Sequence, residues 1–113
     1  MHELSLALEV IELAKREAEK NGVLTIFEME IEVGDLSGVE AETFQSALEL
    51  IVKNTLLEHT RIKLNRQPAF GRCNSCDKVF EMNERMATCP ACHCFPSEIS
   101  GGQAFRVVSI LAE

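Results

Sequence analysis

Two pairs of cysteines carry the strongest chemical signal in this sequence. Cys73 and Cys76 form one Cys-x-x-Cys motif, and Cys89 and Cys92 form a second one a dozen residues further on. Each motif places two thiolates on one tight turn, and two such turns facing each other complete a tetrahedral sulfur site for Zn(II). The spacing therefore predicts a structural zinc site, with a rubredoxin-like iron site, disulfides or free thiols as the alternatives.

The residues beside these motifs bear on the ligand set. Asp77 and His93 follow the two motifs, where a glycine with positive φ is common, and both residues tolerate the left-handed region better than most. His93 and Cys94 are also alternative ligands, although unligated bystanders are the favoured interpretation. The segment holds few large apolar side chains, so metal binding would have to supply much of its folding energy.

A second candidate metal site lies at the N-terminus, in Met1, His2 and Glu3. The α-amine of Met1, the backbone amide nitrogen of His2 and its imidazole can all reach one ion. Such a planar, nitrogen-rich set suits Ni(II) or Cu(II). The alternative is an N-terminus without a ligand, because a histidine at position 2 often occurs by chance.

Composition limits the classes of function. A net charge of −7 and a pI near 5.0 argue against a nucleic-acid-binding protein, which needs a basic face. Five cysteines are an odd number and fit poorly with a secreted disulfide framework. The sequence has no apolar run long enough for a membrane span and no visible signal peptide, so we expect a cytoplasmic protein. A length of 113 residues indicates one domain, or one domain that carries a small insertion.

The first half of the chain predicts a helix over residues 3–21 and a strand over residues 25–33. Leu4, Leu8 and Ile11 recur at helical spacing and are expected to face the core, in an apolar stripe broadened by Leu6, Val10, Leu13 and Ala14. The strand alternates strictly, with Phe27, Met29, Ile31 and Val33 on one face and Glu28, Glu30 and Glu32 on the other. The three carboxylates could bind a metal, but a solvent-facing side of the sheet is favoured, with Arg61, Lys63 and Asn65 opposite them as cross-strand partners.

Three further elements follow. Ser37 and Glu40 match a capping box, with Ser37 as the N-cap of a helix that runs to about Asn54. A strand is predicted over residues 60–66, with Ile62 and Leu64 facing inward. Residues 105–111 predict the last strand, with Phe105 and Val107 on one face and Val108 and Ile110 on the other.

The order of these elements predicts an α/β (α+β) fold. We expect a small three-stranded sheet with two helices on one face, interrupted by an inserted zinc-ribbon-like domain over residues 69–99. An edge strand of this sheet could pair with a second chain, so the prediction for oligomeric state is a monomer or a weak homodimer.

Several segments together resemble one family. They are Met1-His2-Glu3-Leu4-Ser5, the stretch from Gly34 to Glu40 (Gly-Asp-Leu-Ser-Gly-Val-Glu), the paired Cys-x-x-Cys motifs and Gly101-Gly102. In order and spacing they resemble the HypA/HybF family of nickel-insertion accessory proteins for NiFe-hydrogenase maturation, which in some organisms also serve urease. The resemblance covers essentially the whole chain, and Cys94 departs from the usual pattern.

The resemblance implies a nickel metallochaperone rather than an enzyme. It implies a nickel-binding domain (residues 1–68 and 100–113) and a zinc-binding domain (residues 69–99). Transient Ni(II) maps onto Met1, His2 and Glu3, and structural Zn(II) maps onto Cys73, Cys76, Cys89 and Cys92. The implied partners are the companion GTPase HypB, the hydrogenase large-subunit precursor and, in some organisms, urease maturation proteins. A protein-interaction adaptor with zinc and no nickel is the main alternative.

Overall fold

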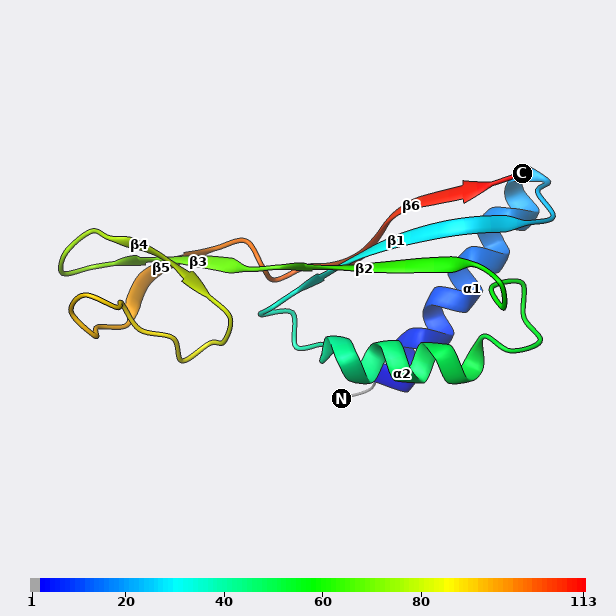
Figure 1. Ribbon diagram of the computed structural model, residues 1–113. Helices are drawn as coiled ribbons and strands as arrows, with labels where there is room; N and C mark the ends of the chain where they lie inside the picture. Colours follow the sequence, from blue (N-terminus) through cyan, green and yellow to red (C-terminus); the bar gives the residue numbers. More distant parts are fainter. Residues whose placement is uncertain (1–2) are drawn as a thin grey trace.

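The computed structural model describes residues 3–113 of the chain. They form an elongated molecule with extents of 55 × 24 × 17 Å, and a three-stranded sheet lies toward each end (Figure 1). The elements are α1 (Glu3–Asn21), β1 (Ile26–Gly34), α2 (Ala41–Ile51), β2 (Arg61–Gln67), β3 (Ala69–Cys73), β4 (Val79–Met82), β5 (Pro96–Ser100) and β6 (Phe105–Ala112). We call α1, α2 and the β2-β1-β6 sheet the α/β body, and the β4-β3-β5 sheet with its loops (residues 69–100) the cysteine module.

The α/β body confirms the predicted α+β architecture. Its central strand, β1, pairs parallel with β2 and antiparallel with β6. Both helices lie on the same face of this sheet (Figure 1), and the core between them includes Met29, Ile31, Phe44 and Leu57, which are completely buried. Neither helix among residues 3–113 is long and apolar enough to cross a membrane.

Helix α1 has the predicted bounds, and its buried face agrees with the prediction in part. Leu4 and Leu8 are each 51% exposed, although their spacing predicts burial. The predicted residues Val10, Ile11 and Ala14 are buried, and the rest of the buried stripe consists of Ala7 and Ala18. Alanine side chains let a helix approach its neighbours closely, so Ala7 and Ala18 are buried while Leu4 and Leu8 stay half exposed.

A β-bulge changes which residues of β1 face the core. The register of β1 against β6 shifts immediately after Ile26, so Ile26 is buried while Phe27 is 51% exposed. The prediction that Phe27 faces inward is therefore wrong, because strict alternation holds only in a strand without a bulge. The other predicted inward residues of this strand, Met29, Ile31 and Val33, are buried.

The outer face of β1 carries the row of glutamates. The register aligns Glu28 with Arg61, Glu30 with Lys63, and Glu32 with Asn65. The amide of Asn65 donates a hydrogen bond to the Glu30 carboxylate. The guanidinium of Arg106, in β6, lies 3.2 Å from the carboxylate of Glu32. The predicted cross-strand alignment is confirmed, and it accounts for the carboxylate row without a ligand.

Helix α2 begins later than predicted. Its N-cap is Glu40, whose carboxylate accepts hydrogen bonds from the N–H groups of Glu42 and Thr43 at 2.9 and 3.2 Å. The predicted capping box with Ser37 as N-cap is wrong, because the Ser37 hydroxyl instead accepts from the Val39 N–H within the preceding turn. Aspartate, glutamate and serine compete for such N–H groups, and the sequence alone does not decide which one caps the helix.

Helix α2 also ends earlier than predicted, at Ile51 rather than near Asn54. Asn54 has a φ of 64°, a left-handed conformation that cannot continue a right-handed helix. The helix packs against the core through Phe44 and Leu48, which are buried, and through Ile51, which is partly buried.

The last strand, β6, contains a second irregularity. Its register against β1 shifts by one residue at Val108. The shift brings Ile110 to the same face as Phe105 and Val107, where all three pack against the core, and leaves Val108 37% exposed. The prediction that Val108 and Ile110 share a face is therefore wrong, because a bulge resets the alternation.

The cysteine module has a small core of its own. Its buried residues are Leu36, Ala69, Cys73, Phe80, Met82 and Cys89. Two of these are cysteines of the paired motifs. Leu36 does not belong to the module in sequence, since it lies in the loop that follows β1.

Backbone hydrogen bonds join the two parts of the molecule. The loop after β1 donates from the N–H of Asp35 to the Gln67 carbonyl at 2.8 Å and from the N–H of Leu36 to the Gly102 carbonyl at 2.7 Å. Gln67 is the last residue of β2 before the cysteine module, and Gly102 lies between β5 and β6, where the chain returns to the α/β body. The loop after β1 is therefore hydrogen-bonded to the chain both where it enters the cysteine module and where it leaves it.

Candidate metal centre

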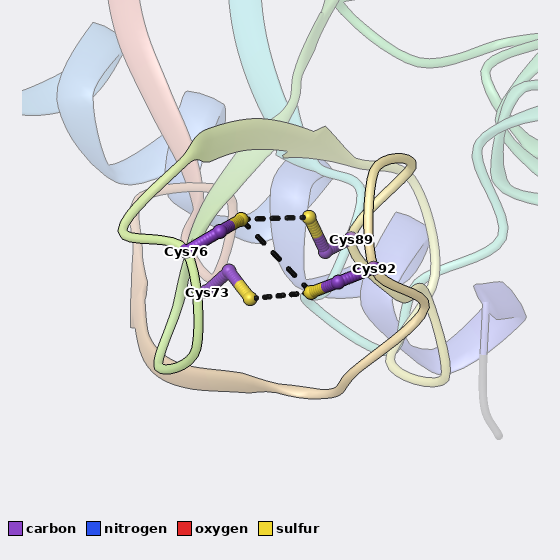
Figure 2. A group of neighbouring side chains, drawn as sticks. All are labelled: Cys73, Cys76, Cys89 and Cys92. Atoms are coloured by element: carbon purple, nitrogen blue, oxygen red, sulfur yellow. Dashed lines mark hydrogen bonds between the residues drawn. The ribbon is translucent and has the colours of Figure 1, made fainter.

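The first Cys-x-x-Cys motif forms a tight turn between β3 and β4. The Cys73 carbonyl accepts a hydrogen bond from the N–H of Asp77 at 2.9 Å, and the Cys73 N–H donates to the Lys78 carbonyl at 2.8 Å. Asp77 has a φ of 62°, which closes the turn. This arrangement directs the thiols of Cys73 and Cys76 toward the second motif (Figure 2).

The second motif repeats this geometry. The Cys89 carbonyl accepts from the N–H of His93 at 2.8 Å, the Cys89 N–H donates to the Cys94 carbonyl at 2.9 Å, and His93 has a φ of 62°. Asp77 and His93 therefore both adopt the left-handed conformation for which the sequence suited them. Two turns of the same form face each other across the module.

The four sulfur atoms converge between these turns (Figure 2). They all lie within 4.8 Å of one another. Individual distances are 3.0 Å from Cys73 to Cys92, 3.6 Å from Cys76 to Cys89, and 3.9 Å from Cys76 to Cys92. None of the four is in a disulfide.

The donor set fits a tetrahedral metal ion. Zn–S bonds of about 2.3 Å in a tetrahedron place neighbouring sulfurs about 3.8 Å apart. Two of the measured sulfur distances, 3.6 and 3.9 Å, lie close to that value. The contact between Cys73 and Cys92, at 3.0 Å, is shorter and is a hydrogen bond between thiols. To reach the tetrahedral spacing around an ion, the distance between these two sulfurs would have to increase by roughly 0.8 Å.

The close packing of the sulfurs shifts their pKa values. The hydrogen bond from the Cys92 thiol lowers the pKa of Cys73 to about 6, and the same contact raises the pKa of Cys92. The Cys92 backbone N–H is the main cause that lowers the pKa of Cys89. The Lys78 N–H lowers the pKa of Cys76, but the Cys89 thiol and desolvation outweigh it, so the pKa of Cys76 is raised. The pKa values of Cys73 and Cys89 are thus lowered and those of Cys76 and Cys92 are raised, and a bound cation would replace the protons of all four thiols.

The fifth cysteine and the neighbouring histidine lie outside this cluster. The Cys94 sulfur accepts from the Ser75 hydroxyl at 3.5 Å and lies 3.8 Å from the Cys92 carbonyl. His93 is exposed on the surface of its turn. Among residues 3–113, the group of side chains placed to hold a metal consists of Cys73, Cys76, Cys89 and Cys92 alone.

The second predicted site falls largely beyond what the structure describes. Met1 and His2 lie outside the described residues, and Glu3 is the first residue of α1. A Glu3 carboxylate oxygen accepts a hydrogen bond from the backbone N–H of Glu40 at 3.1 Å. Sequence reasoning missed this contact, because the two residues are 37 positions apart and no local pattern connects them.

The chain matches one protein family over almost its whole length. The family model described as hydrogenase/urease nickel incorporation, metallochaperone, hypA matches residues 1–112. A protein named hydrogenase maturation factor HypA from Parabacteroides distasonis is 38% identical over 111 residues, covering 98% of this chain and 96% of the relative. A protein of the same name from Geobacter metallireducens is 34% identical and covers 100% of both chains.

A solved structure has the same fold. The solution structure of the Ni metallochaperone HypA from Helicobacter pylori superposes with a TM-score of 0.65 at 25% identity. The match covers 99% of this chain and 97% of that one.

Proposed function

This chain belongs to the HypA family of hydrogenase/urease nickel-incorporation metallochaperones, and we propose that it binds Ni(II) at its N-terminus and delivers it to the large-subunit precursor of a NiFe hydrogenase. The family is one of maturation factors, not of catalysts. The observation that carries the proposal is the match of the family model from residue 1 to residue 112, which includes both sets of predicted ligands.

The chemistry of the first residues supports nickel as the cargo. In our proposal the Met1 amine, the His2 amide nitrogen and the His2 imidazole form a planar chelate, with Glu3 nearby. Binding must deprotonate an amine with a free pKa of about 7.7–8.0, so nickel affinity rises with pH. Copper(II) binds such a site more tightly than nickel by intrinsic affinity, so selectivity then depends on metal supply and on the partners. A site at the N-terminus with only a few protein ligands is suitable for an ion that must later be released.

The four cysteines suit a permanent ion of a different kind. We propose that Cys73, Cys76, Cys89 and Cys92 hold Zn(II), supported by the convergence of their sulfurs within 4.8 Å. Four thiolates close the coordination sphere of zinc and leave no position for a substrate, as in structural zinc sites. When bound, the ion supplies folding energy to a module with a small apolar core.

The proposal divides the chain between the two metals. Residues 1–68 and 100–113 form the nickel-binding domain, and residues 69–99 form the zinc-binding domain. The partners we propose are the GTPase HypB and the hydrogenase large-subunit precursor, with urease maturation proteins where urease is served. We place the protein in the cytoplasm, because free thiols held at a metal site are typical of a reducing compartment.

The test is a nickel-binding isotherm on untagged protein, with the zinc content measured in parallel. A one-residue extension before Met1 blocks the amine, and His2→Ala removes the imidazole. Each change should abolish tight nickel binding and leave the zinc content unchanged. Nickel that titrates normally onto the extended protein would refute the N-terminal site, and a wild-type protein with zinc but no nickel would favour the adaptor function instead.

A further inference from the structure

One side chain of the cysteine module reaches the loop that leads into α2. The Arg85 guanidinium donates a hydrogen bond to the Leu36 carbonyl at 2.8 Å. The Leu36 side chain is 2% exposed and packs in the core of the module with Cys73 and Cys89. Arg85 therefore holds the backbone of a residue whose side chain is already anchored among the cysteines.

The loop from Gly34 to Glu40 is fixed along most of its length. The Leu36 N–H donates to the Gly102 carbonyl, and the Ser37 N–H donates to the Gly34 carbonyl at 3.0 Å. The Val39 N–H donates to the Ser37 hydroxyl at 3.2 Å. These hydrogen bonds restrain the backbone on both sides of Leu36 and Ser37, so the loop has few free torsions with which to absorb a displacement.

The far end of the loop meets the beginning of α1. The Glu40 carboxylate caps α2 through the N–H groups of Glu42 and Thr43, which fixes the orientation of its own peptide. The Glu40 N–H in turn donates to Glu3 at 3.1 Å. In this way a continuous series of contacts runs from the cysteine module to Glu3.

We propose that Arg85 is a positioning residue for the N-terminal nickel site, acting through Leu36, the 34–40 loop and the Glu40 N–H on the carboxylate of Glu3. This inference rests on the proposed function, since it takes Glu3 as part of the nickel site. It assigns to the cysteine module a role beyond its own metal: the module sets the geometry in which the cargo ion is held. The hydrogen bond of Arg85 goes to Leu36 and not to Glu3, the one proposed cargo ligand that the structure describes.

The experiment compares Arg85→Ala with Arg72→Ala. Arg72 is a matched control, because it is an exposed arginine of the same module whose ion-pair partners are Asp77 and Glu98, not the loop. Two readouts are taken on untagged protein: hydrogen-exchange protection of the Glu40 amide by NMR without nickel, and the nickel isotherm. Zinc content is measured in both variants to show that the module is intact.

We expect Arg85→Ala to reduce protection of the Glu40 amide and to weaken nickel binding by about fivefold, the low end for coupled sites. Arg72→Ala should change neither readout. In a Glu3→Ala background, Arg85→Ala should have little further effect on nickel, because the group through which it acts is gone. A purely structural role would lower the melting temperature in both backgrounds without this dependence on Glu3.

The two readouts separate the possible failures. An unchanged Glu40 amide in Arg85→Ala would overturn the mechanical link itself. Reduced protection with unchanged nickel affinity would overturn the role in cargo binding while the N-terminal site stands. If the one-residue extension fails to abolish nickel binding in the wild type, the proposed function fails first, and the amide measurement still reports whether the module positions Glu40.

Discussion

The α/β body and the cysteine module are stabilised in different ways. The body buries a continuous core of aliphatic and aromatic residues, among them Phe44, which meets Phe105 edge to face at 5.1 Å. The module buries Phe80, Met82, Leu36 and Ala69 together with two of its four candidate metal ligands. Because two of the ligands are part of this core, the core depends on the metal ion that holds the ligands together. The body should therefore fold without metal, and the module should not.

The largest effect we predict is loss of the module in Cys89→Ser. Cys89 is completely buried, and zinc binding contributes about 10–16 kcal/mol in small structural zinc sites. Amide signals of residues 69–100 should collapse toward random-coil shifts, while those of α1 and α2 stay dispersed. Cys94→Ser is the control, and it should keep its zinc because Cys94 lies outside the cluster. Full zinc retention in Cys89→Ser would contradict the ligand assignment.

The second-largest effect we predict is that acidification unfolds the cysteine module before the α/β body. The unfolded module binds protons on its thiols, whose ordinary pKa is about 8.5, whereas thiolates bound to zinc carry none. The unfolded state thus binds more protons, and the stability of the module falls as the pH falls. With four thiols the loss reaches about 5 kcal/mol per pH unit below that pKa. A pH titration followed by NMR should show the module unfolding while the body is still folded, and simultaneous unfolding of both would contradict the comparison.

The third prediction concerns a substitution that destabilises the α/β body and leaves the cysteine module unchanged. Phe44→Ala removes a completely buried ring from the body and should cost about 3–5 kcal/mol of unfolding free energy, measured by urea denaturation. The zinc content of the module should not change. Phe70→Ala is the control, because Phe70 is 43% exposed on the module and its loss should cost much less. Release of zinc by Phe44→Ala would show that the module depends on the core of the body.

The sequence predicted each region with a different kind of signal, and each signal had its own limit. Spacing located the four cysteines, and the residue types at Asp77 and His93 suited the left-handed turns that the structure contains. Those features are local, since each motif spans six residues or fewer and the turn geometry follows from the residues within it. The contact of Leu36 with the module is not local, so no spacing rule predicts it.

In the α/β body, periodicity predicted the elements but not their irregularities. Alternation placed the glutamate row opposite Arg61 and Lys63 correctly. It failed at Phe27 and Val108, where the register shifts by one residue. A bulge changes the pairing partner rather than the residue types, so an alternating sequence reads the same with or without it. The start of α2 was ambiguous for a similar reason, because the side chains of Ser37 and Glu40 can each accept hydrogen bonds from the N–H groups of a helix and the residue types do not say which one does.

The smallest effect we predict concerns the junction between the regions. Gly101 and Gly102 both have positive φ values, 72° and 69°, so alanine is strained at either position by about 1–2 kcal/mol. They differ in space: a Cβ on Gly101 would meet its nearest atom, the Pro68 carbonyl oxygen, at 3.6 Å, whereas a Cβ on Gly102 would lie 2.6 Å from the backbone nitrogen of Ala69. Backbone cannot rotate away as a flexible side chain can, so the junction itself must shift.

Comparing the two alanine variants therefore isolates the contact from the backbone strain. Gly102→Ala should cost about 1–3 kcal/mol more than Gly101→Ala, the usual range for overpacking. In urea denaturation the extra cost should appear in the α/β body, because the Gly102 carbonyl accepts the Leu36 N–H and a shift there disturbs the loop after β1. Equal stability of the two variants would mean that the connections yield easily, and that the two regions are joined less rigidly than the hydrogen bonds of Leu36 and Asp35 require.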